Sequence, residues 1–366
     1  MKSLFDKIRI AGMTTKNRFV RSATWEGMAE DDGSVSDHLI DVYRRLAAGE
    51  IGMIMTSILY VTETGKGVTR MLGIHDDRMI PGLSRIADAI HEKGSIAVAQ
   101  FVYCGNQAPI GVDEHTFSPS GIPDPITGKR GKEMSCEDIN FLIRAFGDAS
   151  RRAVSAGFDA VQIHAAHGYL LSQFLSPYHN TRTDQYGGPI ENRCRIIAEI
   201  VSLIKKENPA LPVMIKINGE DYFDGGLELN DSIAACRILE QSGLDAIEVS
   251  GGVAASKVSR AMGEAITRPE REGFYAKDGA AIADTVSIPV ISVGGYRSPD
   301  VIRQKMNDTK IELFSLSRPL IAEPGLISRW ASGDSNKARC ISCNKCVTPN
   351  GTSCTVFTHI PHPEKK

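Results

Sequence analysis

Eight short apolar runs, each followed by a longer stretch of helical character, constrain the fold of this chain more than any other feature. Most of the runs are apolar at nearly every position and do not alternate, as expected of strands buried on both faces of a parallel sheet. Eight strand–helix units in series predict a closed (β/α)8 barrel, an α/β TIM barrel. The predicted strands are residues 19–24, 52–61, 95–103, 159–166, 212–218, 245–252, 289–295 and 312–318.

The helical stretches between these strands have apolar residues at three-to-four spacing and recognisable ends. One of them opens with Ser135 followed by Asp138, which is close to a capping box. The alternative fold is an open doubly wound sheet, which normally has a glycine-rich turn after its first strand. Here TWEGMAEDDG follows that strand, so the barrel is favoured. The predicted helices are residues 80–94, 135–157, 187–209 and 230–243.

Two stretches interrupt the repeat. Residues 104–134 are rich in Gly, Pro and Asp and predict a long loop after the third strand, on the face where barrel active sites lie. Residues 334–366 are rich in cysteine and then in Pro, His and Lys. We therefore expect a barrel over residues 1–333 and a Cys-rich C-terminal extension over residues 334–366.

Charge and hydropathy exclude several classes of partner. The formal net charge of -2 offers no basic surface for nucleic acid. No apolar run approaches the roughly 20 residues that span a bilayer, and the N-terminal sequence lacks the apolar stretch and cleavage site of a signal peptide. A cytoplasmic location is the resulting expectation.

The end of the fourth strand carries the residues most suited to catalysis, His164, His167 and Tyr169. Two imidazoles and a phenol at a strand end can hydrogen-bond a polarised carbonyl and deliver a proton. The structural alternative is that one histidine caps backbone groups while the tyrosine packs. The two histidines could also bind a metal, although no acidic or histidine partner is evident at the neighbouring strand ends.

The ends of the last two strands predict a phosphate site. Gly294 and Gly295 follow the seventh strand, and Arg318 follows the eighth. Successive glycines let backbone N–H groups approach a phosphate, and TIM barrels often bind phosphate at this place. Two ordinary glycine turns and a solvated arginine are the alternative interpretation.

Polar residues inside the predicted strands need partners, because burying an unpaired polar group is costly. Gln100 lies in the third strand and Lys216 in the fifth. A bound heteroaromatic ring with carbonyls and ring nitrogens would provide partners for both, whereas a salt bridge from Lys216 to Glu248 is the structural alternative. Near the end of the first strand, Arg21 has an acidic neighbour, and Trp25 either walls a pocket or packs at the rim.

Four of the eight cysteines crowd into the C-terminal extension with the spacing C-x2-C-x2-C-x7-C. In a reducing compartment such a group suggests metal before disulfides. Four thiolates suffice for a [4Fe–4S] cluster or for zinc, and redox-active thiols or an empty remnant stay open as alternatives. The candidate ligands are Cys340, Cys343, Cys346 and Cys354.

Several segments together resemble the Old Yellow Enzyme family of NADH:flavin oxidoreductases over nearly the whole chain. The most specific is HAAHGYLLSQFLSPYHNTRTDQYGGPIENR, residues 164–193. The others occur in the family's order and spacing. They are LFDKIRIAGMTTKNRFVRSAT, VAQFVYCGNQ, VMIKINGEDYFDGG, IEVSGG, VGGYRSP and LSRPLIAEPGL.

The resemblance implies noncovalent FMN across the strand ends, reduced by NADH or NADPH and reoxidised by an α,β-unsaturated carbonyl. His164 and His167 would then hydrogen-bond the carbonyl oxygen, and Tyr169 would protonate the α-carbon. Gln100 would contact the flavin pyrimidine edge, and Lys216, where many members have Arg, would place positive charge beside it. The remaining flavin contacts implied are Ala23, Thr24, Ser57, Gly294, Gly295, Ser317 and Arg318.

The chain also departs from the family pattern. Trp25 occupies the position that often holds a flavin-tuning Thr or Cys, unless the register shifts by one residue to Thr24. Tyr103 replaces a frequent His, and Asn106 a frequent Arg. Trp25 and Tyr103 are therefore expected in the substrate pocket, and the identity of the alkene stays open.

The cysteines resemble those of larger members, which are related to 2,4-dienoyl-CoA reductase and trimethylamine dehydrogenase and bind a [4Fe–4S] cluster just after the barrel. Their spacing here is tighter than in those members. Three hypotheses follow: a stand-alone ene-reductase, a flavin and iron–sulfur electron-transfer component that needs a partner subunit, and a metal-dependent barrel hydrolase using His164 and His167. A homodimer is compatible with each hypothesis.

Overall fold

Eight parallel strands close into a barrel in this computed structural model, which describes residues 2–107, 116–256, 265–266 and 268–357. Each strand pairs with its neighbours in the chain's order, and the last pairs with the first through Phe314 and Phe19. All eight predicted strands are confirmed, and so is the TIM barrel. The barrel strands are β3 (Phe19–Arg21), β4 (Met53–Tyr60), β6 (Ile96–Val102), β9 (Ala160–Ala165), β10 (Val213–Asn218), β11 (Ala246–Ser250), β12 (Val290–Val293) and β13 (Leu313–Leu316).

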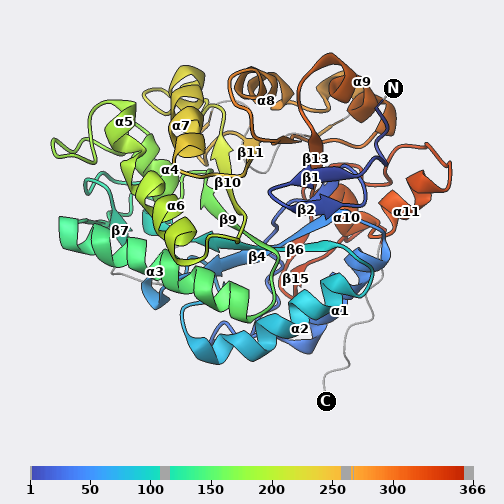
Figure 1. The fold of residues 1–366 in the computed structure, drawn as a ribbon, viewed down its shortest axis with the longest axis horizontal. Helices are drawn as coiled ribbons and strands as arrows, with labels where there is room; N and C mark the ends of the chain where they lie inside the picture. Colours follow the sequence, from blue (N-terminus) through green and yellow to red (C-terminus); the bar gives the residue numbers. More distant parts are fainter. Residues whose placement is uncertain (1, 108–115, 257–264, 267, 358–366) are drawn as a thin grey trace.

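Helices surround the barrel, with their apolar faces packed against the outer faces of the strands (Figure 1). The capping box predicted at Ser135 and Asp138 is present. The helix predicted over residues 187–209 begins later, because Gly188 has a φ of 85° and lies in the turn before it. It is also interrupted at Cys194. The α-helices are α1 (Asp37–Ala48), α2 (Ile80–His91), α3 (Cys136–Ser155), α4 (Leu170–Leu175), α5 (Ile190–Arg193), α6 (Arg195–Glu207), α7 (Leu229–Gln241), α8 (Ala276–Ala283), α9 (Pro299–Asp308), α10 (Arg318–Ala322) and α11 (Leu326–Ala331).

The barrel interior has an apolar layer at one end and a polar layer at the other. Alternate residues of a strand face inward, so β10 contributes Met214 and then Lys216, and β9 contributes Ala160 and then Gln162. The apolar layer is closed from below by the hairpin of β1 (Ile8–Ile10) and β2 (Met13–Thr15). The residues of this layer are Ile10, Val20, Met53, Met55, Ile96, Val98, Ala160, Met214, Ala246, Ile291 and Leu313.

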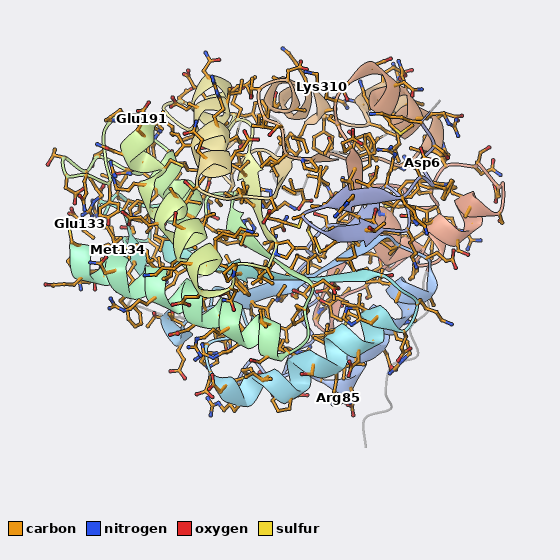
Figure 2. All side chains as sticks on the ribbon, in the orientation of Figure 1. Asp6, Arg85, Glu133, Met134, Glu191 and Lys310 are labelled. Carbon is orange, nitrogen blue, oxygen red and sulfur yellow. The ribbon has the colours of Figure 1, made fainter. Side chains whose placement is uncertain are left out.

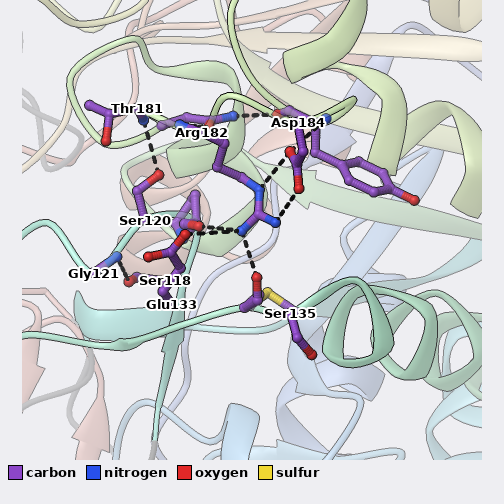
Figure 3. Close-up of polar contacts among 12 residues, drawn as sticks. Ser118, Ser120, Gly121, Glu133, Ser135, Thr181, Arg182 and Asp184 are labelled. Atoms are coloured by element: carbon purple, nitrogen blue, oxygen red, sulfur yellow. Dashed lines mark hydrogen bonds and ion pairs between the residues drawn. The ribbon is translucent and has the colours of Figure 1, made fainter.

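The loop predicted after the third strand is ordered around one arginine in the part that the structure describes. Its short strands β7 (Phe117–Ser118) and β8 (Lys132–Glu133) pair with each other. Arg182 donates to the backbone oxygens of Pro119 at 2.7 Å and Met134 at 2.6 Å. It also contacts Asp184, as Figure 3 shows. Arg182 therefore fastens the loop to the segment that follows β9 and α4.

The C-terminal extension folds back onto the barrel through a small antiparallel hairpin. The hairpin consists of β14 (Val347–Thr348) and β15 (Gly351–Thr352). The backbone N–H of Thr352 donates to Glu26 at 2.6 Å, so the hairpin lies against the segment after β3. The remaining short elements are β5 (Leu72–Gly73), η1 (Glu63–Gly65), η2 (Asp77–Met79), η3 (Gly105–Gln107) and η4 (Pro269–Arg271).

Many charged side chains lie on the periphery of the molecule, as expected for groups that are strongly hydrated. Arg85, Glu191 and Lys310 mark different sides of this surface (Figure 2). Over the described residues, none of the helices combines the length and the apolar character needed to cross a bilayer.

Candidate active site

A cavity of about 720 Å³ opens at the C-terminal ends of the barrel strands. That volume is in the range of cofactor and substrate pockets. Apart from the cysteines, every predicted site residue except Ser57 and Tyr103 lines it. The predicted residues in the lining are Ala23, Thr24, Trp25, Gln100, His164, His167, Tyr169, Lys216, Gly294, Gly295, Ser317 and Arg318.

His164, His167 and Tyr169 form one group of rings at the end of β9. The His164 ring lies 5.2 Å from that of His167 and 4.9 Å from that of Tyr169, centroid to centroid, and both contacts are edge-on. The strand ends at Ala165, and the following turn brings the other two side chains back over the cavity. The trio predicted from the sequence is therefore assembled.

Hydrogen bonding and burial together determine the protonation state of His164. Its Nδ1 accepts from the backbone N–H of Ala166 at 3.2 Å, which assigns the proton of the neutral ring to Nε2. Burial, together with His167 and Lys216, holds the pKa of His164 well below its usual value. His164 is thus a neutral N–H donor at neutral pH.

His167 is held by two polar partners and an unusual backbone conformation. Its φ is 64°, and its backbone N–H donates to Asn218 Oδ1 at 3.2 Å. Its Nε2 lies 2.8 Å from Ser250 Oγ, at the end of β11. Burial and the nearby Lys216 charge lower the pKa of His167 to about 3, so this ring is also neutral. Strain of this kind persists only where surrounding contacts enforce it.

Tyr169 is the N-cap residue of α4, at the end of the turn that follows β9. Burial, with a smaller contribution from Cys104, raises the pKa of the Tyr169 phenol above its usual value. The phenol therefore keeps its proton across the physiological range. A neutral donor pair beside a protonated phenol can stabilise negative charge on an oxygen and supply a proton to a neighbouring carbon.

A hydrogen-bonded network forms the floor of the cavity. Lys216 Nζ donates to Ser22 Oγ at 2.7 Å and to Glu248 Oε1 at 3.2 Å. The salt bridge considered from the sequence therefore forms, and Lys216 also lines the cavity, so the two interpretations coexist. Gln100 Nε2 donates to Gln162 Oε1 at 2.5 Å in the same layer.

Two observations show that the floor and rim fit a flavin mononucleotide. Gln100 Oε1 is buried and has no hydrogen-bond partner among the described residues, so the cavity presents an acceptor that a ring N–H would satisfy. Positively charged Lys216 lines the same cavity and can act as a donor. A flavin pyrimidine edge, which carries an N–H between two carbonyls, matches this pairing of acceptor and donor.

The glycine turn after β12 allows close approach to the backbone. Gly294 has a φ of 148° and Gly295 a φ of 74°. A Cβ on Gly295 would lie 2.6 Å from the Phe274 ring, and one on Gly294 would lie 3.0 Å from the backbone nitrogen of Phe274. With Arg318 across the rim, these glycines form a cradle suited to phosphate.

Ser57 and Tyr103 lie outside the lining of the cavity. The backbone N–H of Ser57 donates to the Tyr43 hydroxyl at 2.6 Å, and the adjacent Ile58 faces the cavity instead. Tyr103 is fully buried, with its hydroxyl 3.2 Å from Thr64 Oγ1. Their roles toward flavin and substrate stay predictions.

Trp25 forms part of the wall, and its indole Nε1 is buried without a hydrogen-bond partner in the described part of the chain. Thr352 Oγ1 donates to the Trp25 backbone oxygen at 2.6 Å, so the C-terminal hairpin and the tryptophan are attached to each other. Arg21, at the end of β3, pairs with Glu26 at 3.3 Å, as the sequence suggested.

The four clustered cysteines line one small pocket beside the main cavity. Cys346 contributes to both, and Arg318 Nη1 donates to Asn344 Oδ1 at their boundary. Backbone N–H groups point at two of the sulfurs, from Ser342 to Cys340 at 3.4 Å and from Phe357 to Cys354 at 3.3 Å. Within the described ranges, no three His, Cys, Asp or Glu side chains are close enough to hold a single metal ion.

Sequence reasoning missed several residues of the site. Ser22, Ser250 and Thr352 line the cavity, and Gln162 supports its floor. A usable signal existed for three of them, because they are polar residues at inward-facing positions near the ends of apolar strands. Thr352 had no such signal, since its place depends on how the extension folds back.

Known proteins share this architecture. A 4,4'-dithiodibutanoate disulfide reductase of Rhodococcus erythropolis is 30% identical over 97% of this chain and 95% of its own length. A metal reductase of Desulforamulus reducens is 34% identical over 94% of this chain, and this chain spans about half of its length, 51%. An NADH oxidase of Thermoanaerobacter brockii is 32% identical, with 53% of its length covered.

Solved structures show the same fold. A 2-naphthoyl-CoA reductase complex superposes with a TM-score of 0.87 at 27% identity, covering 94% of this chain and 54% of that one. An Old Yellow Enzyme homologue from Zymomonas mobilis superposes with a TM-score of 0.81 at 22% identity, over 98% of this chain and all, 100%, of that one. The family model for NADH:flavin oxidoreductase / NADH oxidase matches residues 3–337. The chain therefore belongs to this family, the Old Yellow Enzyme family.

Proposed function

We propose that this protein is a flavin-dependent NAD(P)H oxidoreductase that reduces the carbon–carbon double bond of α,β-unsaturated carbonyl compounds. The observation that carries the proposal is the group of two neutral imidazoles and one protonated phenol over a flavin-sized cavity. An electron-poor alkene needs its carbonyl oxygen stabilised and its α-carbon protonated, and these residue types supply both functions.

FMN, when bound, would supply hydride chemistry by accepting electrons from NADH or NADPH and passing them on. Gln100 and Lys216 would hold its pyrimidine edge, and Gly294, Gly295 and Arg318 would hold its phosphate. Ala23, Thr24 and Ser317 also line the cavity and would contact the rest of the flavin. Trp25 narrows the space left for substrate.

The histidines and the tyrosine have separate tasks in this proposal. His164 donates its Nε2 proton in a hydrogen bond to the substrate oxygen, and His167 completes the site for that oxygen. Tyr169 transfers its phenol proton to the α-carbon. Because both rings stay neutral, they stabilise charge by hydrogen bonding and do not lose activity through deprotonation near neutral pH.

The test separates the two half-reactions. Tyr169→Phe should slow alkene reduction by roughly 10²–10⁴-fold, the usual contribution of a general acid, while flavin reduction by NAD(P)H stays near wild type. Tyr186→Phe is the matched control, because its phenol binds Glu199 at 3.0 Å, away from the cavity lining. Equal loss in both half-reactions would contradict a proton-donor role, and protein that binds no FMN would contradict the proposal as a whole.

A second function concerns the cysteine pocket. We propose that Cys340, Cys343, Cys346 and Cys354 bind a [4Fe–4S] cluster and relay electrons to or from a partner protein. Support comes from their convergence on one pocket, from the two N–H···S contacts and from the shared position of Cys346 at both cavities. Ligands of a cluster need not converge as closely as those of a single ion, so the spacing of the thiols favours iron–sulfur over zinc.

Metal and sulfide analysis of anaerobically purified protein tests this second function. Iron and acid-labile sulfide in equal amounts, lost together in Cys343→Ser, would support it. Zinc, or neither element, would exclude the cluster. Assays with an unsaturated ketone and with a disulfide then distinguish the alkene proposal from the activity named for the Rhodococcus relative.

A further inference from the structure

Glu248 is a charged residue below the cavity whose burial demands an explanation. Its side chain is 0% exposed and that of Lys216 is 5% exposed, with 3.2 Å between the charged atoms. Removing two charges from water is expensive, and a buried ion pair is often no more stabilising than apolar residues of similar size. Glu248 itself does not line the cavity, so it cannot contact a bound molecule directly.

The Glu248 carboxylate can only accept hydrogen bonds, and it accepts three. Ser22 Oγ donates at 2.7 Å and Lys216 Nζ at 3.2 Å to Oε1, and Gln162 Nε2 donates at 3.0 Å to Oε2. Burial opposes its ionisation, but Lys216 and the donors hold the pKa of Glu248 below its usual value. The group is therefore a carboxylate.

That acceptor sets the direction of the amides above it. Since Gln162 must turn its NH₂ group toward Glu248, its Oε1 is left to accept from Gln100 Nε2 at 2.5 Å. Gln100 is in turn left with Oε1 as its unpartnered atom. The orientation of both amides, which is ordinarily ambiguous, follows from one carboxylate.

The same carboxylate neutralises the charge on the cavity floor. Lys216 has one titratable register partner on each adjacent strand. These partners are His164 on β9 and Glu248 on β11. His164 is neutral, and His167 nearby is neutral as well. The floor thus holds one positive and one negative charge, with only the positive one at the cavity.

We propose that Glu248 is a positioning residue that acts as the internal counter-ion of Lys216, so that it lowers the electron affinity of the flavin bound above and turns Gln100 toward the ring N–H. This inference rests on the proposed binding of FMN in the cavity. Glu248 acts only through Lys216 and Gln162. The Lys216–Glu248 pair, and not Lys216 alone, sets the charge that the cofactor experiences.

Glu248→Gln tests the counter-ion role with an isosteric side chain. The amide leaves the Lys216 charge uncompensated, which favours the anionic reduced flavin. We expect the dissociation constant of oxidised FMN, divided by that of reduced FMN, to rise at least tenfold. For a two-electron couple, this change corresponds to a midpoint potential about 30 mV more positive. Titration of apo-protein and spectroscopic redox titration of the holoprotein measure these two quantities independently of turnover.

Two control variants make the result specific. Glu26→Gln makes the same chemical change in a second buried pair, with Arg21, whose side chains are 3% and 2% exposed, and it should leave the potential unchanged. In a Lys216→Met background, Glu248→Gln should produce no positive shift, because a buried carboxyl without its cation takes up a proton and has no charge for the substitution to remove. A positive shift in either control would overturn the inference.

Gln162→Leu isolates the orientation of the amides and leaves the ion pair intact. It should weaken the binding of oxidised and reduced FMN by the same factor, because Gln100 loses its fixed direction without any change in charge. If the binding of oxidised and reduced FMN weakened by different factors, the role of Glu248 in orienting Gln100 through Gln162 would be overturned. A Glu248→Gln holoprotein with an unchanged or more negative potential would overturn the counter-ion role, whereas a wild-type protein that binds no FMN would instead overturn the proposed function.

Discussion

The floor and one wall of the cavity are built in opposite ways. The floor consists of side chains on barrel strands, such as Lys216 and Gln100, which are almost completely buried and hydrogen-bonded in a network. The wall is the hairpin β14–β15, whose Val347 is 53% exposed. It attaches to the segment after β3 through two hydrogen bonds from Thr352, both 2.6 Å long.

This difference determines what each region can contribute. Strand register fixes the floor, so its geometry persists as long as the barrel is folded. In the wall, Val347, Pro349 and Asn350 are exposed, and exposed segments of this kind can open without global unfolding. Chemistry therefore depends on the floor, and retention of the cofactor and access to it depend on the wall.

The two site histidines at the end of β9 should make stability depend on pH. In the unfolded chain a histidine titrates near 6.5, whereas the pKa of His167 is lowered to about 3 and that of His164 is lowered as well. The unfolded state thus binds more protons below pH 6.5, and the free energy of unfolding should fall by on the order of 1 kcal/mol per pH unit for each histidine.

Denaturant unfolding of the wild type and of His164→Asn/His167→Asn between pH 7 and pH 5 measures this effect. The double variant should show the shallower loss of stability as the pH falls, because only the wild type must bury these rings without protons. His75 and His179, whose pKa values are also lowered by burial, remain in both proteins and cancel. Parallel curves for the two proteins would show that the His164 and His167 rings are not held neutral.

A substitution at Gly351 should detach the β14–β15 hairpin without unfolding the barrel. Gly351 has a φ of 104°, and a Cβ there would lie 2.6 Å from the Glu26 backbone oxygen. Gly351→Ala adds this clash to a backbone strain of about 1–3 kcal/mol. The strain alone is as large as the contribution of the two hydrogen bonds, about 0.5–1.5 kcal/mol each, so with the clash the hairpin should detach. Hydrogen exchange over residues 340–357 should speed up and FMN should bind more weakly, with barrel exchange unchanged.

Gly333→Ala is the matched control for this prediction. Gly333 has a φ of 99°, but a Cβ there would meet no atom within 4 Å. It therefore reproduces the backbone strain without the clash at the hairpin. If both variants weaken FMN binding equally, the wall has no specific role in retaining the cofactor.

The sequence predicts the floor far better than the wall, for a physical reason. Buried parallel strands have a strong pattern, and because active sites of barrels lie at strand ends, His164 and Lys216 could be located from chain position alone. The wall depends on contacts between distant segments, such as the bond from Thr352 to Trp25, 327 residues apart in the chain. No local pattern encodes such a contact.

Glu248 and Gln162, which support the floor, were predicted less completely than the floor and better than the wall. Glu248 was recognised as a partner for Lys216, because inward-facing positions on adjacent strands follow from strand periodicity. Its link to Gln100 through Gln162 was missed, since three strands must be placed in register before the hydrogen bonds appear. The departures at Trp25 and Tyr103 were visible, but their consequences depend on packing that only the fold reveals.

The smallest expected effect belongs to the hydroxyl that joins wall and rim. Thr352→Val keeps the shape and removes the donor to the Trp25 backbone oxygen, which should reduce the stability of the docked hairpin by about 1 kcal/mol. FMN affinity should then fall by no more than several-fold, and Trp25 fluorescence should become more accessible to a quencher. Thr285→Val, which removes a similar bond to Ile282 at 2.8 Å in α8, should alter neither property. Because Trp25 is joined directly to the hairpin, unchanged quenching in Thr352→Val would mean that the wall is held by its apolar contacts and by Arg318 instead, and would place its weak point closer to the cysteines.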